Sequence, residues 1–153
     1  MSARVEVVDQ AGLGPGAGPV SDLVAAALEA EGASGAVVVA FIEEQAMAVL
    51  NARYRGVDEP TDVLSFRSEE GEAGWPKSRT GPDLGEIVVC PSVVRRYAEE
   101  EDAVFGAQLG WTLIHGVLHL LGYDHEKDDG GMRRREQGLL VELVVAVRAL
   151  DGR

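Results

Sequence analysis

Residues 35–42 read GAVVVAFI, an almost unbroken apolar run that is rich in β-branched valine. A glycine opens the run and two glutamates follow it, so the apolar stretch has the length of a strand rather than of a helix. A strand without polar alternation is typical of the middle of a sheet whose two faces are both covered. We therefore predict a central strand here, around which the rest of the fold is built.

Segments on either side of this run alternate between strand-like and helix-like patterns. Strands are expected at 4–10 (RVEVVDQ, period two), 62–66 (DVLSF) and 84–90 (LGEIVVC). Helices are expected at 22–32 after a Ser21 cap, at 43–56, at 91–101 with Pro91 in the first turn, at 103–121 and at 132–150. The interleaving predicts an α+β fold of mixed α/β layers, with a mixed sheet of about four strands packed by about five helices. One domain over residues 1–153 is expected, with a long polar loop at 67–83.

Composition favours a cytoplasmic protein with no membrane partner. The first residues contain no apolar run long enough for a secretory signal. The late apolar stretch at 139–150 is interrupted by Glu142 and Arg148 and is shorter than the roughly 20 residues of a bilayer span. The single cysteine, Cys90, suits a reducing compartment, and its apolar neighbours predict a buried thiol in a core strand.

The net charge argues against unaided binding of nucleic acid. Fourteen basic residues against 26 acidic ones give a formal charge of −12 at pH 7. Long-range repulsion would oppose the approach of a polyphosphate chain. An RNA or DNA partner would therefore have to meet a local basic patch or be delivered by another macromolecule.

All three histidines of the chain lie in the stretch HGVLHLLGYDH, residues 115–125. His115 and His119 are four residues apart in a helical pattern, which stacks their side chains on one face. Gly122 can end the helix in a left-handed conformation and bring His125 back to the same point. Three neutral imidazoles with an open fourth position are typical of a catalytic zinc or similar divalent site. The alternative, unrelated packing or surface histidines, is disfavoured because unpaired imidazoles in so apolar a segment are costly to desolvate.

Two neighbouring residues refine this hypothesis. Asp124 adjoins the third histidine, where it can accept a hydrogen bond from a ligand N–H or simply solvate the loop. In metalloproteases of the H-E-x-x-H type, a glutamate follows the first histidine and acts as general base, whereas this chain has Gly116 there. The pattern keeps the metal geometry and lacks the peptidase base.

A second group of polar residues lies around the strand expected at 62–66. The stretch LNARYRGVDEPTDVLSF places six polar candidates around a helix end and a strand start: Arg53, Arg55, Asp58, Thr61, Asp62 and Ser65. The planar guanidinium of Arg55 suits a phosphate oxygen, although an arginine here equally suits the helix C-terminus. Other basic residues (Lys77, Arg79, Arg95, Arg96, Arg133 and Arg135) are more typical of a solvated surface, and Trp75 either stacks on an exposed base or packs within its loop.

These segments together resemble the YbeY family of bacterial single-strand-specific endoribonucleases of ribosomal RNA maturation. The resemblance rests on HGVLHLLGYDH, LNARYRGVDEPTDVLSF and LGEIVVC, which stand in the family's order between about residues 49 and 126. It implies a zincin-like fold, one zinc ion held by His115, His119 and His125, and an arginine important for activity, here Arg55. It also implies action at the 3′ end of small-subunit ribosomal RNA and in ribosome quality control. Where family members commonly run LSFP, this chain has Arg67 in place of the proline.

The combined hypothesis is a hydrolase in which metal-activated water attacks an RNA phosphodiester while Arg55 stabilises charge on the phosphoryl oxygens. Zinc is the default for three histidines, although nickel or cobalt fits similar ligands. The expected partners are single-stranded ribosomal RNA, the small ribosomal subunit and protein cofactors that deliver substrate. Two alternatives stay open: a peptidase, and a non-catalytic ribosome-assembly factor whose structural zinc has Asp124 or Asp128 as its fourth ligand.

Overall fold

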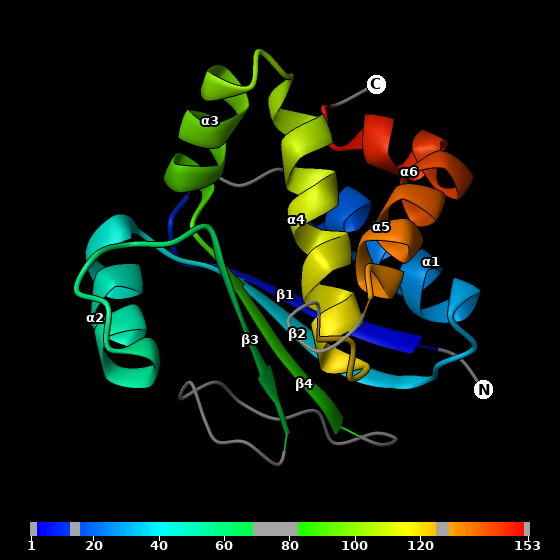
Figure 1. Ribbon diagram of the computed structural model, residues 1–153, viewed down its shortest axis with the longest axis horizontal. Helices are drawn as coiled ribbons and strands as arrows, with labels where there is room; N and C mark the ends of the chain where they lie inside the picture. The colour runs from blue at the N-terminus through cyan, green and yellow to red at the C-terminus, as the bar shows by residue number, and fades with distance from the viewer. Residues whose placement is uncertain (1–2, 13–15, 69–82, 125–128, 152–153) are drawn as a thin grey trace.

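The computed structural model describes residues 3–12, 16–68, 83–124 and 129–151. Its sheet contains β1 (Ala3–Asp9), β2 (Gly35–Phe41), β3 (Val63–Arg67) and β4 (Asp83–Val89), in the spatial order β1-β2-β4-β3 (Figure 1). Strands β1, β2 and β4 run parallel, and β3 pairs antiparallel with β4. Every residue of β2 is buried, which confirms the central strand predicted from its apolar run. The predicted mixed four-stranded sheet is likewise confirmed.

The described residues form six helices instead of about five. They are α1 (Ala17–Ala30), α2 (Glu44–Arg55), α3 (Pro91–Glu100), α4 (Phe105–Leu120), α5 (Gly131–Glu142) and α6 (Val144–Ala149). The single helix expected at 132–150 breaks at Leu143, where φ is −107° and ψ is 27°. The break lets α6 turn and bury Val147 against α4 while its other valines face solvent.

Helix α1 begins earlier than the sequence indicated. Gly16 is its N-cap, and the Ser21 hydroxyl, which was expected to cap the helix, instead donates to the Gly18 carbonyl at 3.2 Å within the first turn. Pro19 fits this first turn because the N–H groups there have no intrahelical acceptor, so a missing donor costs nothing. The prediction of a Ser21 cap was therefore wrong.

One face of the sheet holds the larger hydrophobic core. Helix α1 contacts β1 and helix α4 (yellow) contacts β3 and β4, while α5 and α6 pack against these helices (Figure 1). Helix α4 contributes a row of fully buried side chains: Leu109, Leu113, Ile114, Val117 and Leu118. The apolar residues on all sides of this helix thus correctly indicated that it is buried. Its two histidines are therefore held by a well-packed helix.

The opposite face of β3 and β4 packs against α2 in a smaller cluster. Met47 of α2 lies there with Leu64 and Phe66 of β3 and with Val88 of β4. Because side chains alternate along a strand, Ser65 between them faces α4 on the other side. Cys90 belongs to this second cluster and is fully buried, as predicted, although it lies one residue after β4 as the N-cap of α3.

Among the described residues, no single helix has both the length and the apolar composition needed to cross a membrane. Only α3 and α4 taken together pass that test, and they are bent by 118° at the break between them.

Candidate functional site

The site is centred on two histidines that α4 presents on the same side, one turn apart. His115 and His119 lie with their ring centroids 4.5 Å apart and their planes nearly perpendicular, at 82°. Their Nε2 atoms approach one another to 3.1 Å. The i, i+4 spacing therefore brings both imidazoles to one point, as the sequence predicted.

The other ring nitrogen of each histidine meets a hydrogen-bond acceptor. Nδ1 of His115 contacts the carboxylate of Glu136 on α5, and Nδ1 of His119 lies 3.1 Å from the carbonyl oxygen of Tyr123. A carboxylate or a carbonyl can only accept, so each neutral ring carries its proton on Nδ1. Both Nε2 atoms then face the same space, an arrangement that suits a cation between them.

The geometry fits a metal ion. Two nitrogen ligands at about 2.0–2.1 Å from a tetrahedral zinc ion lie about 3.3 Å apart, close to the separation found here. Hydrogen bonds from Nδ1–H to a carboxylate and to a carbonyl are also the usual outer contacts of metal-binding histidines. Within the described ranges there is no group of three or more His, Cys, Asp or Glu side chains that could hold a metal. His125, the predicted third ligand, and Asp128 lie outside those ranges.

The chain turns back after α4 in the way the sequence indicated. Gly122 has a φ of 98°, in the left-handed region that favours glycine. Its N–H bonds to the carbonyl of His119, and the N–H of Tyr123 bonds to that of Leu118, each at 3.0 Å. This closure of the helix end places the Tyr123 carbonyl beside His119.

Gly116 faces the sheet rather than the histidine site. A Cβ atom added there would lie 2.8 Å from the Ile87 side chain and 3.3 Å from the Ser65 hydroxyl, which itself donates to the Gly116 carbonyl. The glycine thus lets α4 approach β3 and β4 closely. A glutamate at this position, as in the metalloprotease motif, has no room and no route to the Nε2 atoms.

A cluster of charged and hydrogen-bonded residues connects the loop after α4 to α1 and α5. The Tyr123 hydroxyl donates to Glu31 at the end of α1 at 2.9 Å, and Arg135 of α5 forms an ion pair with the same carboxylate and with Glu142. The bond to Glu31 raises the pKa of Tyr123 and that of Arg135. This Glu31 cluster (Glu31, Tyr123 and Arg135) joins the loop after His119 to the helix that carries Glu136.

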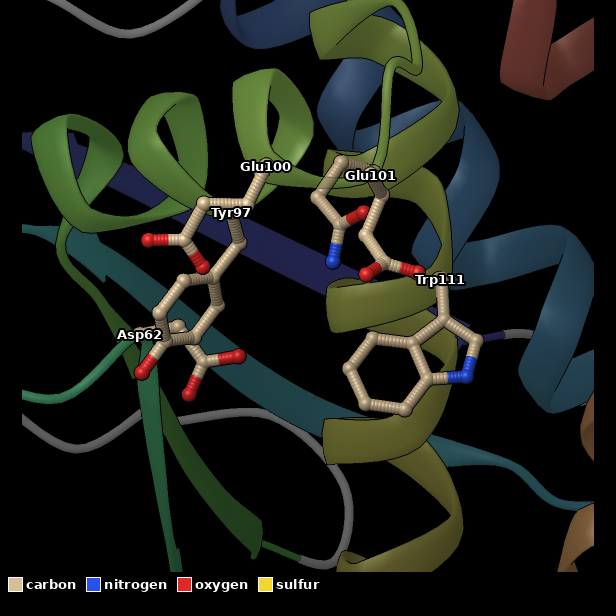
Figure 2. A pocket seen from close by; sticks show the side chains of 6 residues that line it. Asp62, Tyr97, Glu100, Glu101 and Trp111 are labelled. Atoms are coloured by element: carbon tan, nitrogen blue, oxygen red, sulfur yellow. The ribbon is translucent and has the colours of Figure 1, made fainter.

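A cavity of about 440 Å³ opens beside the histidines, between α3 and α4. It is lined by Asp62, Tyr97, Glu100, Glu101, Gln108 and Trp111. Figure 2 shows Trp111 on one side and Asp62 with Tyr97 on the other. The Trp111 ring stacks on His115 with centroids 4.9 Å apart and planes at 25°.

Asp62 is held at the start of β3. The Thr61 hydroxyl and the Val63 N–H donate to its Oδ1 atom at 3.2 and 2.9 Å. Burial raises the pKa of the Asp62 carboxyl, while these hydrogen bonds and the nearby His115 partly oppose the rise. Asp62 therefore belongs to the surroundings of the histidines, although the sequence offered it only as one of six polar candidates.

Arg55 lies elsewhere in the fold. It is the exposed last residue of α2, the helix that packs against the opposite face of β3 from α4. Its neighbour Tyr54 packs edge to face on Phe66 of β3. The predicted role of Arg55 in holding a phosphodiester stays a prediction.

Several other predicted candidates have structural roles or lie outside the described residues. Arg96 pairs with Glu44, and Arg95 lies over the ring of Phe105, 4.2 Å from its centroid. Asn51, which the sequence did not mark as a candidate, anchors the segment after α2 by donating to the Glu59 carbonyl at 2.8 Å. Trp75, Lys77 and Arg79 fall in 69–82, outside the described residues, with most of the predicted loop.

Sequence reasoning missed the acceptors of the histidines. Glu136 is 94% buried and lies 21 residues beyond His115, in a helix where it is one polar residue among many. The Tyr123 carbonyl is a backbone atom and has no signature in the sequence. Asp124, which was expected to be a possible acceptor for a ligand N–H, adjoins His125 and its role there stays a prediction.

Comparison with known proteins places these features in a family. A sequence model described as Endoribonuclease YbeY matches residues 18–144. A protein of Desulforamulus reducens named Endoribonuclease YbeY is 41% identical over 129 residues, which cover 81% of this chain and 84% of that protein. A protein of the same name from Alcanivorax borkumensis is 43% identical over 104 residues, which cover 68% of this chain but only 59% of that protein.

A solved structure agrees with the fold. The solution structure of a Thermotoga maritima protein matches with a TM-score of 0.62 and 29% sequence identity, over 95% of this chain and 92% of that chain. The α+β class predicted from the sequence is confirmed, whereas the narrower description as zincin-like stays a prediction.

Proposed function

The chain belongs to the Endoribonuclease YbeY family, and on that premise we propose that it hydrolyses phosphodiester bonds within single-stranded ribosomal RNA at the histidine site. The observation that carries this proposal is the convergence of the His115 and His119 Nε2 atoms, each with its Nδ1 atom bound to an acceptor. Such a pair is of little use for packing and is well suited to hold a metal ion.

One zinc ion per chain, held by His115, His119 and His125, is part of the proposal. When bound, a zinc ion would lower the pKa of a water molecule towards about 7, which would supply a nucleophile for hydrolysis near neutral pH. Nickel or cobalt would fit the same nitrogen ligands. The support lies in the donor set and in the 3.1 Å separation of its two described nitrogen atoms.

The residues of the chain have distinct tasks in this proposal. Glu136 and the Tyr123 carbonyl keep the protons of both imidazoles on Nδ1, so that both Nε2 lone pairs stay available. Arg55 is proposed to hold a phosphoryl oxygen of the RNA through its planar guanidinium, since its exposed side chain is accessible to a long ligand. Gly116 supports a nuclease over a peptidase, because the position of the protease glutamate is filled by the packing of α4 on the sheet.

The setting of the reaction follows from charge. A net charge of −12 opposes encounter with free RNA, so we place the reaction on the small ribosomal subunit in the cytoplasm, with a protein cofactor that helps to deliver the 3′ end of the small-subunit RNA. A role in ribosome quality control belongs to the same proposal.

The deciding experiment measures cleavage of single-stranded ribosomal RNA by metal-loaded protein, with and without a chelator. His115→Ala and His119→Ala should each lose metal and cleavage together, because each removes one of the converging nitrogen ligands. Metal content is measured on the same samples. Cleavage that survives both substitutions and the chelator would contradict the proposed site.

A protein that holds one metal ion per chain but cuts neither free RNA nor RNA in small ribosomal subunits would contradict the enzymatic proposal. That outcome would favour the alternative of a non-catalytic assembly factor. The acidic net charge is the observation that supports this alternative.

A further inference from the structure

The cavity between α3 and α4 adjoins the histidine site without containing either histidine. Its volume of about 440 Å³ falls within the range of roughly 300–1,000 Å³ that is typical of pockets for small molecules. Trp111 belongs both to its wall and to the stack on His115. A flat ligand on the cavity side of this indole would therefore lie one aromatic ring away from a proposed metal ligand.

The lining combines aromatic surface with hydrogen-bond acceptors. Trp111 and Tyr97 supply rings, whereas Asp62, Glu100 and Glu101 supply carboxylates, and none of the described residues that line the cavity is a lysine or an arginine. The three negative charges disfavour a phosphate group in this space. The same carboxylates suit a neutral ring whose edge carries N–H donors.

Asp62 has one oxygen available for such a donor. Both of its hydrogen bonds within the described structure fall on Oδ1, from Thr61 and from Val63. No hydrogen bond from the described residues reaches Oδ2. In Figure 2 the carboxylate lies across the cavity from Trp111, so an N–H group on a ring beside the indole would face an acceptor.

We propose that this cavity is a nucleobase subsite, which receives a base of the RNA strand next to the cleaved bond and prefers bases with amino groups. The base stacks on Trp111, and its amino or imino N–H groups donate to Asp62 and to the glutamates, while the negatively charged backbone stays outside. Guanine, adenine and cytosine carry such an amino group. Uracil presents two carbonyl oxygens and a single N–H, so its carbonyls would face carboxylates.

This subsite rests on the proposed ribonuclease function but is tested separately from it. The first arm measures binding of uncharged nucleosides by the fluorescence of Trp111 in a Trp75→Phe protein, in which Trp111 is the only tryptophan because the chain has two. Guanosine, adenosine and cytidine should quench this fluorescence at concentrations about tenfold lower than uridine, the effect of one hydrogen bond to a charged acceptor. Equal quenching by all four, or none by any, would overturn the subsite.

Asp62→Asn is the decisive variant. The amide oxygen of asparagine can keep the bonds from Thr61 and Val63, so the change replaces the acceptor Oδ2 by an NH₂ donor without a change of shape. The preference should then shift towards uridine by about tenfold, so that the four nucleosides bind about equally, a change that a purely structural role of Asp62 would not produce. Glu99→Gln, the same loss of charge at an exposed position of α3 outside the cavity lining, should leave the preference unchanged.

A second variant tests the carboxylates independently, in case Asp62→Asn does not fold. Glu100→Gln with Glu101→Gln changes only exposed side chains and should weaken the preference for amino-bearing bases. An unchanged preference in both variants would contradict the proposed role of the carboxylates. Quenching by a lysine-rich peptide in place of nucleosides would overturn the subsite in favour of a cation pocket.

The second arm measures cleavage of short single-stranded RNAs in which one position is varied at a time. Cleavage that favours an amino-bearing base at one fixed position from the cut, and that loses this preference in Asp62→Asn, is the expected result. Cleavage without any such preference would overturn the subsite and leave the ribonuclease intact. Nucleoside binding with the expected preference, but no cleavage of any RNA, would contradict the ribonuclease and leave the subsite intact.

Discussion

The two regions that the sequence marked as functional are built in opposite ways. The histidines lie on α4, which is buried along most of its length, and each Nδ1 atom has an acceptor, Glu136 on α5 for His115 and the Tyr123 carbonyl just after α4 for His119. Arg55 ends α2 with an exposed side chain, on a helix that covers the other face of β3. The histidine geometry is therefore set before any ligand binds, whereas the position of the guanidinium is left for a ligand to determine.

This difference predicts which property each substitution should change. Changes around α4 should alter folding and metal binding, because packing and hydrogen bonds fix the histidines. Changes at Arg55 should alter the reaction alone. Four substitutions test this contrast, from the largest expected free-energy effect to the smallest.

Gly116→Glu should prevent the chain from folding stably. The added side chain meets Ile87 and Ser65, and its charge would be buried without a partner, at a cost of at least about 3 kcal/mol. Gly138→Glu on α5 is the matched control, since a Cβ there meets only the Arg135 guanidinium at 3.6 Å. Urea denaturation of both variants measures the contrast. A stable Gly116→Glu protein with metal-dependent proteolysis would revive the peptidase alternative.

Glu136→Leu should weaken metal binding by about 10–100-fold, because it removes the acceptor that fixes the His115 ring. Glu136→Gln keeps an acceptor oxygen and should lose much less. Competition with a chelating dye gives both affinities. Equal affinities for Glu136→Leu and the parent protein would mean that the α4 packing alone fixes His115, which would weaken the contrast with Arg55.

Tyr123→Phe should lower the free energy of unfolding by about 1.5 kcal/mol, the lower end of what a hydrogen bond to a charged group contributes, because the bond from the hydroxyl to Glu31 is only partly buried. The backbone carbonyl that accepts from His119 is retained, so metal affinity should change far less than in Glu136→Leu. Thermal unfolding and the same dye competition check the two halves of this prediction. A large loss of metal would show that the Glu31 cluster, and not the helix end alone, positions His119.

Arg55→Glu should change the free energy of unfolding by no more than about 0.5 kcal/mol and leave metal content intact, since the side chain is exposed. RNA cleavage should nevertheless be lost through repulsion of the phosphate. Arg148→Glu is the matched control, because Arg148 is also an exposed arginine in the last turn of a helix. Equal RNA cleavage by both variants would mean that Arg55 only stabilises the C-terminus of α2 and does not take part in the reaction.

Much of the fold was predictable because local patterns follow from chain geometry. The unbroken apolar run of β2 indicated a strand covered on both faces, and Pro91 correctly marked the first turn of α3. The ends of elements were harder. The start of α1 and the break at Leu143 depend on how each helix packs, and neither Ser21 nor the apolar pattern of 139–150 records that packing.

By itself, the sequence determined the elements of the candidate site that depend on spacing along one helix. The i, i+4 pair of His115 and His119 and the turn at Gly122 follow from the helical period and from the conformational freedom of glycine. The identity of the third ligand rests on that same spacing, since His125 lies outside the described residues.

Only the tertiary structure decided what surrounds those histidines. Glu136 reaches His115 because α5 packs against α4, Gly116 is needed because α4 lies close to the sheet, and Trp111 and Asp62 share a cavity because the start of β3 lies near α3 and α4. These contacts join residues from 21 to 51 positions apart. No local period encodes such distances, since they are set by the burial of apolar faces that bring separate elements together.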